Sequence, residues 1–305
     1  MSVIKTKEED GGGATSGQGQ AVWIASYPKS GNTWVRVFIN NLMREVSGGC
    51  EEAYSINSLE DCTYLAAYMG PLFVECLGKS LGEASMAEIA EVRTEVQARF
   101  VKLLNEAVYI KTHSSVANVD GFPNINFDIT KAAVYIVRNP LDVTVSFARF
   151  FGVSLDAAIG FMANEAAGLP VSDMHPPEFL CSWSCHVASW ISVPNRPVMI
   201  LRYEDMLAEP EGSFGRLAGF LGLKPTTEQL RRAVAKSSFS ELSKQEAEHG
   251  FLERPATAES FFRVGKAGQW REVLSQGQVE AIVSDHASMM MRCGYLPETW
   301  GNIEE

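Results

Sequence analysis

A glycine-containing loop at residues 27–34 (YPKSGNTW) is the feature that most constrains how this chain folds. The residues before it, 21–26 (AVWIAS), form a short apolar segment that is typical of a buried strand. The residues after it, 33–44, carry apolar side chains at helical spacing on one face, namely Val35, Phe38, Ile39 and Leu42. A strand joined to a helix by such a loop is the repeating unit of an α/β fold.

Three further apolar segments predict strands, at residues 107–112 (AVYIKT), 132–137 (AAVYIV) and 197–203 (PVMILRY). Helical patterns lie between them, and Pro140 suits the first turn of a helix because proline has no N–H to leave unpaired there. Strands that alternate with helices predict a three-layer α/β fold, with a central, mostly parallel sheet flanked by helices.

Residues 50–105 are expected to be helical. Apolar side chains recur there at steps of three and four: Met86, Ile89, Val92, Val96, Phe100 and Leu103. We interpret most of this stripe as core packing. No repeat or linker divides residues 21–305, which predicts a single domain. Residues 1–20 mix charges with Gly, Ser and Gln, and they are predicted to be a disordered N-terminal tail.

Composition excludes several classes of function. The net charge is −11, which disfavours binding to nucleic acid, although a local basic pocket for a small anion is compatible with it. No apolar run approaches the roughly 20 residues of a membrane span, and the N-terminus lacks the apolar stretch of a signal peptide. Six scattered cysteines without a CxxC pair predict reduced thiols in a cytoplasmic protein and no metal site.

The first loop has the chemistry of an anion site. Ligands of parallel sheets bind at the carboxyl ends of the strands, where this loop is expected to lie. A glycine loop that opens a helix offers free backbone N–H groups and the positive end of the helix dipole, which favour a phosphate or a sulfate. Lys29, Asn32 and Thr33 add further donors. The loop is not a Walker A motif, because its lysine precedes the glycine.

Lys111 lies near the end of the second predicted strand and His113 follows directly after it, two residues apart and therefore on the same side of an extended chain. A histidine suits a general base at physiological pH, with an apparent pKa expected near 6–7. The other four histidines are assigned no role: His186 is expected to be packed beside Trp183 and Trp190, and His175, His249 and His286 are expected to be exposed.

Several segments, in order, resemble the PAPS-dependent sulfotransferase family, where PAPS is 3′-phosphoadenosine 5′-phosphosulfate. Residues 27–34 are similar to the family's 5′-phosphosulfate loop, usually YPKSGTTW, and VYIVRNPLDVTVSF (134–147) is similar to its 3′-phosphate segment. FFRVGKAGQW (261–270) resembles its RKGxxGDW loop, and YIKTHSS (109–115) resembles the strand with its catalytic histidine. SWSCHVASW (182–190) and RYEDM (202–206) also resemble family segments. The resemblance implies a P-loop-like fold and transfer of a sulfuryl group from PAPS to a hydroxyl.

The resemblance also implies which residues act. His113 would be the catalytic base, and Lys29 and Lys111 would stabilise charge on the leaving group. Arg138, Arg263 and Ser146 would hold the 3′-phosphate, because a guanidinium binds phosphate bidentately. The other donor-binding positions would be Ser30, Gly31, Asn32, Thr33, Trp34, Tyr203, Ser238, Phe239, Phe262, Val264 and Gly265, with Trp34 and Phe239 as candidates for stacking on adenine. PAPS would be the co-substrate, with no metal.

The chain departs from the family pattern at three places. Asn32 stands where threonine is common, which keeps a donor. Val264 and Gln269 replace a lysine and an aspartate of the last loop, which removes one positive charge there. Residues 271–280 (REVLSQGQVE) lack the Thr-Val of the family's dimer motif, so this motif does not support a homodimer.

Two other functions stay open. A P-loop-type nucleotide or small-molecule kinase predicts a Walker A motif and a magnesium-binding aspartate after a strand, and neither is evident. A non-enzymatic nucleotide-binding member would be expected to lack Lys29 or His113, and both are present. The acceptor is expected to be a small hydroxyl compound. Apolar side chains in the variable segments predict an aromatic or lipophilic one: Tyr64, Tyr68, Phe73, Phe150, Phe151, Phe161, Met162 and Phe251.

Overall fold

The computed structural model describes residues 20–49, 54–104, 107–172, 175–255, 258–263 and 265–297. The predicted tail therefore lies outside the described residues, apart from Gln20, and so does Val264. A five-stranded sheet forms the centre, in the order β2-β3-β1-β6-β9, and all of its neighbours pair in parallel. Its strands are β1 (Ala21–Ser26), β2 (Thr63–Leu65), β3 (Val108–Thr112), β6 (Thr130–Val137) and β9 (Val198–Arg202).

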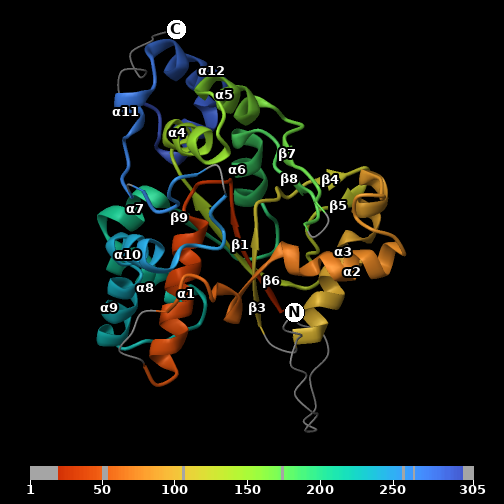
Figure 1. The fold of residues 1–305 in the computed structure, drawn as a ribbon, viewed down its shortest axis with the longest axis horizontal. Helices are drawn as coiled ribbons and strands as arrows, with labels where there is room; N and C mark the ends of the chain where they lie inside the picture. Colours follow the sequence, from red (N-terminus) through yellow and green to blue (C-terminus); the bar gives the residue numbers. More distant parts are fainter. Residues whose placement is uncertain are drawn as a thin grey trace.

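Helices cover both faces of this sheet, which confirms the predicted three-layer α/β fold (Figure 1). The period of two in each strand explains how both faces become apolar. In β1, Trp23 and Ala25 face one core, whereas Val22 and Ile24 face the other. The core around Ile24 includes side chains from α1 (Asn32–Val46), α7 (Tyr203–Ala208), α8 (Pro210–Phe220) and α9 (Thr227–Lys236). The core around Trp23 includes α2 (Gly70–Leu77), α3 (Met86–Leu104), α4 (Pro140–Phe151), α5 (Leu155–Ala163), α6 (Trp183–Ile191) and α12 (Gln276–Cys293).

Shorter elements connect these layers. They are the 3₁₀ turns η1 (Leu59–Asp61) and η2 (Ala66–Met69), the helices α10 (Phe239–His249) and α11 (Trp270–Val273), and the two-stranded pairs β4 (Asn118–Val119) with β5 (Phe122–Pro123) and β7 (Gly168–Leu169) with β8 (Glu178–Phe179). Within the described ranges no single helix is long and apolar enough to cross a membrane. The pair α4 and α5 passes that test together by length and composition, with a bend of 116° between them.

The start of α4 follows local sequence rules. Asn139 caps the helix by accepting a hydrogen bond from the N–H of Leu141, and Pro140 occupies the first helical position, as predicted. The strand before it ends at Val137, so the segment between strand and helix is only two residues long. This tight connection carries Arg138 directly to the carboxyl edge of the sheet.

Two sequence predictions are wrong. Residues 50–105 are not all helical, because Thr63–Leu65 forms the edge strand β2, which is too short to show a periodic pattern. His286 is not exposed: it is buried on the inner face of α12, where its ring packs edge-on against Trp183 and its Nδ1 lies 2.9 Å from the hydroxyl of Ser184. Helix α6 covers that face, and the sequence of α12 alone could not show it.

The stripe of α3 is also only partly core. Ile89, Val96 and Phe100 are buried, as expected, whereas Met86 and Leu103 at the two ends of the helix are exposed by 41% and 54%. The ends of a long helix extend past the sheet that it covers, so the periodic pattern overstates the buried length.

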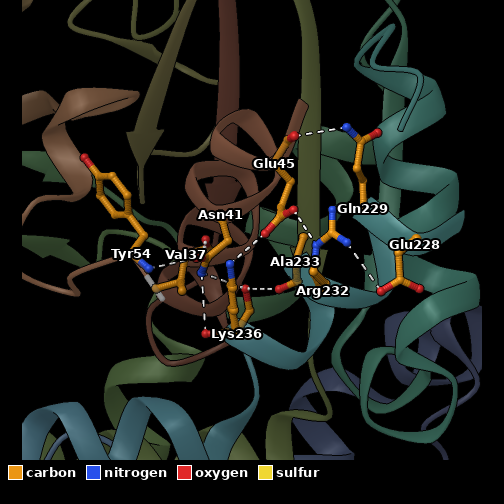
Figure 2. Close-up of polar contacts among 10 residues, drawn as sticks. Val37, Asn41, Glu45, Tyr54, Glu228, Gln229, Arg232, Ala233 and Lys236 are labelled. Atoms are coloured by element: carbon orange, nitrogen blue, oxygen red, sulfur yellow. Dashed lines mark hydrogen bonds and ion pairs between the residues drawn. The ribbon is translucent and has the colours of Figure 1, made fainter. Parts of the chain in front are cut away.

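A buried carboxylate fixes α9 against α1 (Figure 2). Glu45, which is only 1% exposed, accepts hydrogen bonds from Arg232 Nε at 2.8 Å and Lys236 Nζ at 2.7 Å. One turn earlier, Asn41 donates to the hydroxyl of Ser237 at 3.1 Å. These contacts fix where α9 ends, and therefore where Phe239 begins the next helix beside the first loop.

Candidate functional site

The carboxyl ends of β1, β3 and β6 open onto one cavity of about 960 Å³. Most of the site residues predicted from sequence line it: Lys29, Gly31, Asn32, Thr33, Trp34, Lys111, His113, Arg138, Ser146, Tyr203, Phe239, Phe262, Arg263 and Gly265. Ser30 is buried beneath the loop, and Ser238 is not among the lining residues. Segments that lie more than 200 residues apart thus contribute to one site.

The first loop is held in a shape that few residues adopt. Lys29 has a φ of 67° and Gly31 a φ of 104°, both in the left-handed region. A Cβ at Gly31 would lie 2.7 Å from the ring of Tyr203, so only glycine fits there. The Asn32 amide donates to the carbonyl of Ile24 at 2.9 Å and to the hydroxyl of Ser26 at 3.2 Å. Asn32 therefore ties the loop to β1 with its side chain and offers its backbone N–H to the cavity.

The ammonium of Lys29 lies between two aromatic rings. Its Nζ is 3.7 Å from the ring centre of Phe150 and 4.1 Å from that of Phe261, which is cation–π geometry. Burial lowers the pKa of Lys29 to about 7, and the positive charges of Arg138 and Lys111 act in the same direction. Lys29 is therefore a cation whose charge responds to any anion placed in the cavity.

The tautomer of His113 follows from its hydrogen bonds. Its Nδ1 lies 2.8 Å from the carbonyl oxygen of Ser26, and a carbonyl can only accept, so Nδ1 carries the proton. The lone pair of the neutral ring is then on Nε2. Burial, together with the positive charge of Lys111, lowers the pKa of His113 to about 4. This is below the 6–7 expected from sequence, because a pattern of residues does not show how deeply the ring is buried.

Backbone contacts hold His113 on both sides. Its N–H donates to Glu178 Oε1 at 2.6 Å, and its carbonyl accepts from His186 Nε2 at 2.9 Å. His186 is fully buried, as expected, and its Nδ1 lies 2.9 Å from the hydroxyl of Tyr135. Burial lowers the pKa of His186 to about 3, which keeps this second ring neutral. His186 therefore supports the backbone at His113, and it is not among the residues that line the cavity.

Lys111 lies beside a carboxylate that the sequence reasoning missed. Glu253 lies 3.7 Å from Lys111 Nζ and 2.6 Å from Arg36 Nη1, and Arg36 is itself buried. Burial alone would raise the pKa of Glu253, but the charges of Lys111 and Arg36 lower it overall. The pair with Arg36 spans 217 positions of the sequence, so no local signal pointed to it.

Arg138 bridges the first loop and the last loop, residues 261–270. Its Nη1 donates to the carbonyl of Lys29 at 3.0 Å, and its Nη2 donates to that of Lys266 at 3.3 Å. The guanidinium lies 4.2 Å from the ring centre of Tyr203. Its buried Nε and the buried hydroxyl of Ser30 have no hydrogen-bond partner among the described residues. A buried polar atom without a partner is costly. Arg138 lines the cavity, so an anion bound there would give its guanidinium further acceptors, whereas Ser30 does not line it.

The last loop is fastened to α4. Asp142 accepts hydrogen bonds from the N–H groups of Gly268 at 2.6 Å and Trp270 at 3.1 Å. Gly265 has a φ of 58°, and a Cβ there would lie 2.3 Å from the ring of Phe239. The only sequence signal for Asp142 is an acidic residue in the first turn of a helix, which is common and indicates no particular function.

Two of the predicted donor-binding residues, Trp34 and Ser238, form hydrogen bonds with the protein itself. Trp34 donates from Nε1 to the carbonyl of Ser237 at 2.8 Å, which fixes the indole at the cavity wall. Ser238 is the N-cap of α10, where its hydroxyl accepts from the N–H of Glu241 at 3.4 Å. The Ser238 hydroxyl therefore caps helix α10.

The proposed acceptor wall divides into two groups. Four of its predicted members line the cavity: Tyr68, Phe150, Phe151 and Phe251. The other four pack into the core or against it: Tyr64, Phe73, Phe161 and Met162. Hydrophobicity does not distinguish these groups. Among the residues that the structure describes, no three His, Cys, Asp or Glu side chains come together as a set of metal ligands.

Comparisons with known proteins agree with this geometry. Residues 20–294 match the family described as Sulfotransferase domain. The chain is 26% identical to Sulfotransferase 1A1 of Canis lupus familiaris, with 89% of this chain and 83% of that protein covered. It is 25% identical to the flavonol 3-sulfotransferase of Flaveria bidentis, with 86% and 78% covered.

Solved structures show the same fold. A mouse sulfotransferase, SULT7A1, complexed with PAP (adenosine 3′,5′-bisphosphate) aligns with a TM-score of 0.56 at 20% identity, covering 90% of this chain and 87% of that one. Retinol dehydratase complexed with retinol and PAP aligns with a TM-score of 0.57 at 20% identity, covering 90% and 82%.

Proposed function

We propose, from the premise that this chain belongs to the sulfotransferase domain family, that it moves a sulfuryl group from PAPS to a hydroxyl of a small acceptor, with His113 as base. The observation that carries this proposal is the shared cavity. It holds a buried arginine with an unpartnered Nε, two lysines, and a histidine whose lone pair is on Nε2. These are the groups that a donor with two anionic ends and a hydroxyl acceptor need side by side.

The residues present fit PAPS. Arg138, Ser146 and Arg263 offer donors for its 3′-phosphate, and the first loop offers backbone N–H groups at the start of α1 for its 5′ end. A Cβ at Gly31 or Gly265 would collide with the ring of Tyr203 or Phe239, so these glycines let the two loops pack closely against the aromatic side chains of the cavity. PAPS supplies the sulfuryl group and a phosphate leaving group.

The side chains of this cavity would have different roles in the reaction. Lys29 and Lys111 would neutralise negative charge as it grows on the leaving-group side. His113 would take the proton of the acceptor hydroxyl at Nε2, while Nδ1–H stays on the Ser26 carbonyl and holds the ring in place. The depressed pKa of His113 keeps the ring neutral, and therefore able to accept a proton, at pH 7.

The acceptor would be aromatic or lipophilic. Tyr68, Phe150, Phe151 and Phe251 give the cavity an apolar wall. The name of one relative, flavonol 3-sulfotransferase, denotes an acceptor of this class. A screen of phenols, sterols and alkyl alcohols with labelled PAPS would identify the acceptor.

One experiment separates this function from a nucleotide kinase. PAP at about 100 times its Kd should stabilise the protein by roughly 2.7 kcal/mol in a thermal melt, and transfer from labelled PAPS should survive EDTA. Stabilisation by ATP with magnesium, without any response to PAP, would instead support the kinase.

Arg138→Ala should weaken binding of PAP by about 2–5 kcal/mol, as expected when one partner of a buried charged contact is removed. The 3′-phosphate does not change in the reaction, so PAPS and PAP should lose affinity together. Titration calorimetry with PAP measures the loss. Arg138→Lys is the control, since it keeps the charge and loses the planar fork. An unchanged Kd in the alanine variant would place the 3′-phosphate elsewhere.

A further inference from the structure

Arg149 lies at the donor end of the cavity, although the sequence assigned it no role. On α4, Asp142, Ser146 and Arg149 are spaced four and three residues apart, so they share one face of the helix. The two hydrogen bonds from Gly268 and Trp270 to Asp142 show that this face looks onto the last loop. Arg149 therefore lies one turn beyond Ser146 on the side that meets the donor.

Hydrogen bonds within that loop connect Arg149 to Arg138. Arg149 Nη1 lies 3.5 Å from Gln269 Oε1, and Gln269 Nε2 donates to the carbonyl of Lys266 at 3.1 Å. The same carbonyl accepts from Arg138 Nη2 at 3.3 Å. The two guanidinium groups are thus linked through one short loop, and both line the cavity.

A third guanidinium, that of Arg263, lies close to Arg149. Arg149 is exposed, yet partial burial lowers its pKa and the positive charge of Arg263 acts in the same direction. Across the described ranges, neither arginine forms an ion pair with a carboxylate. Neighbouring cations without a counter-ion favour an anion that can contact both, and a phosphate monoester carries up to two charges and three terminal oxygens.

We infer that Arg149 binds the 3′-phosphate of the donor, as a third guanidinium beside Arg138 and Arg263. This inference rests on the proposed function. Arg149 shares its helix face with Ser146, the residue assigned to the 3′-phosphate, so it is expected to meet that end of the donor. Arg149 therefore contributes to the discrimination between nucleotides that carry a 3′-phosphate and those that do not.

The test compares two nucleotides in one variant. Arg149→Gln should weaken PAP by roughly 10-fold to 100-fold, the usual worth of a hydrogen bond to a charged group. It should leave 5′-AMP, which has no 3′-phosphate, within twofold of wild type. With PAPS, KM should rise while kcat at saturation stays unchanged. Arg292→Gln is the matched control, because Arg292 is exposed on α12 and its loss changes net charge equally.

Each other outcome contradicts the inference in a different way. An unchanged PAP affinity in Arg149→Gln, with wild type binding PAP, overturns the inference and leaves the proposed function intact. Equal losses for PAP and 5′-AMP would assign Arg149 to the 5′ end or to the fold, and would also overturn it. If wild type itself does not bind PAP, both the inference and the proposed function fail.

Discussion

Lys29→Ala should lower kcat by roughly 10²–10³, the usual effect of removing one donor that stabilises charge in the transition state. Lys29 lies in the first loop, and its ammonium is held between Phe150 and Phe261 within reach of the donor end of the cavity. The carbonyl that Arg138 contacts belongs to the backbone of residue 29, so this bond survives the substitution. The fold and the PAP affinity should therefore change much less than turnover.

The pH dependence of the same residue gives a second measurement. Since burial lowers the pKa of Lys29 to about 7, the free enzyme loses this cation as pH rises through 7. We expect kcat/KM to fall above pH 7, because kcat/KM reports the free enzyme. A bound anionic donor raises the pKa of Lys29, so the fall in kcat should come at higher pH.

Two variants test this assignment. Lys29→Arg keeps its charge across this range and should lack the fall in kcat/KM above pH 7, even if its rate is lower. Lys224→Ala, an exposed lysine outside the cavity, is the control for loss of charge. Turnover of Lys29→Ala within threefold of wild type would reject the role of Lys29.

His113→Ala should lose at least roughly 10²-fold in turnover, within the range for general acid–base catalysis, while it still binds PAP. His113 lines the cavity, and the contact of its Nδ1 with the carbonyl of Ser26 does not involve Lys29 or Gly31 of the first loop. Turnover and PAP affinity should be measured on the same purified variant. His249→Ala, an exposed histidine of α10, is the matched control.

The acid side of the pH profile tests the state of His113. Burial depresses its pKa to about 4, so neutral imidazole persists well below pH 6. We expect kcat/KM to stay level as pH falls from about 6, where Lys29 is fully charged, to about 5, and to decline only as pH approaches 4. A decline of kcat/KM centred at pH 6–7 would show that the ring of His113 in the free enzyme is more solvated than it is in the structure. Near-normal turnover of His113→Ala would exclude the ring as base.

Much of the site could be read from sequence because its chemistry lies at strand ends. A buried strand shows itself by its apolar run, and the polar residues directly after it must meet at the carboxyl edge of a parallel sheet. This rule alone predicted that Lys29, Lys111 and Arg138 lie at one edge of the sheet, and all three line the cavity. The resemblance to a known family added the roles of Ser146 and Arg263, which no spacing rule could assign.

The rest depended on contacts between distant parts of the chain. Glu253 approaches Lys111 only after a loop near the C-terminus has packed over β3, and Asp142 meets Gly268 across 126 positions. The division of the aromatic residues into cavity wall and core depends on which side of a helix meets a neighbouring helix. Depth of burial, which determines the pKa of His113, is likewise a property of the packed molecule.

The close approach of Gly265 and Phe239 restricts the order in which these two positions can be substituted during evolution. With the ring 2.3 Å from where a Cβ would stand, almost any new side chain at 265 is blocked while Phe239 remains. A smaller residue at 239 removes the collision, but the φ of 58° still admits little beyond glycine, asparagine or aspartate. Change at 239 must come first, and it gives up a candidate surface for adenine. These two positions therefore form a coupled pair, and libraries that seek a different donor nucleotide should vary both at once.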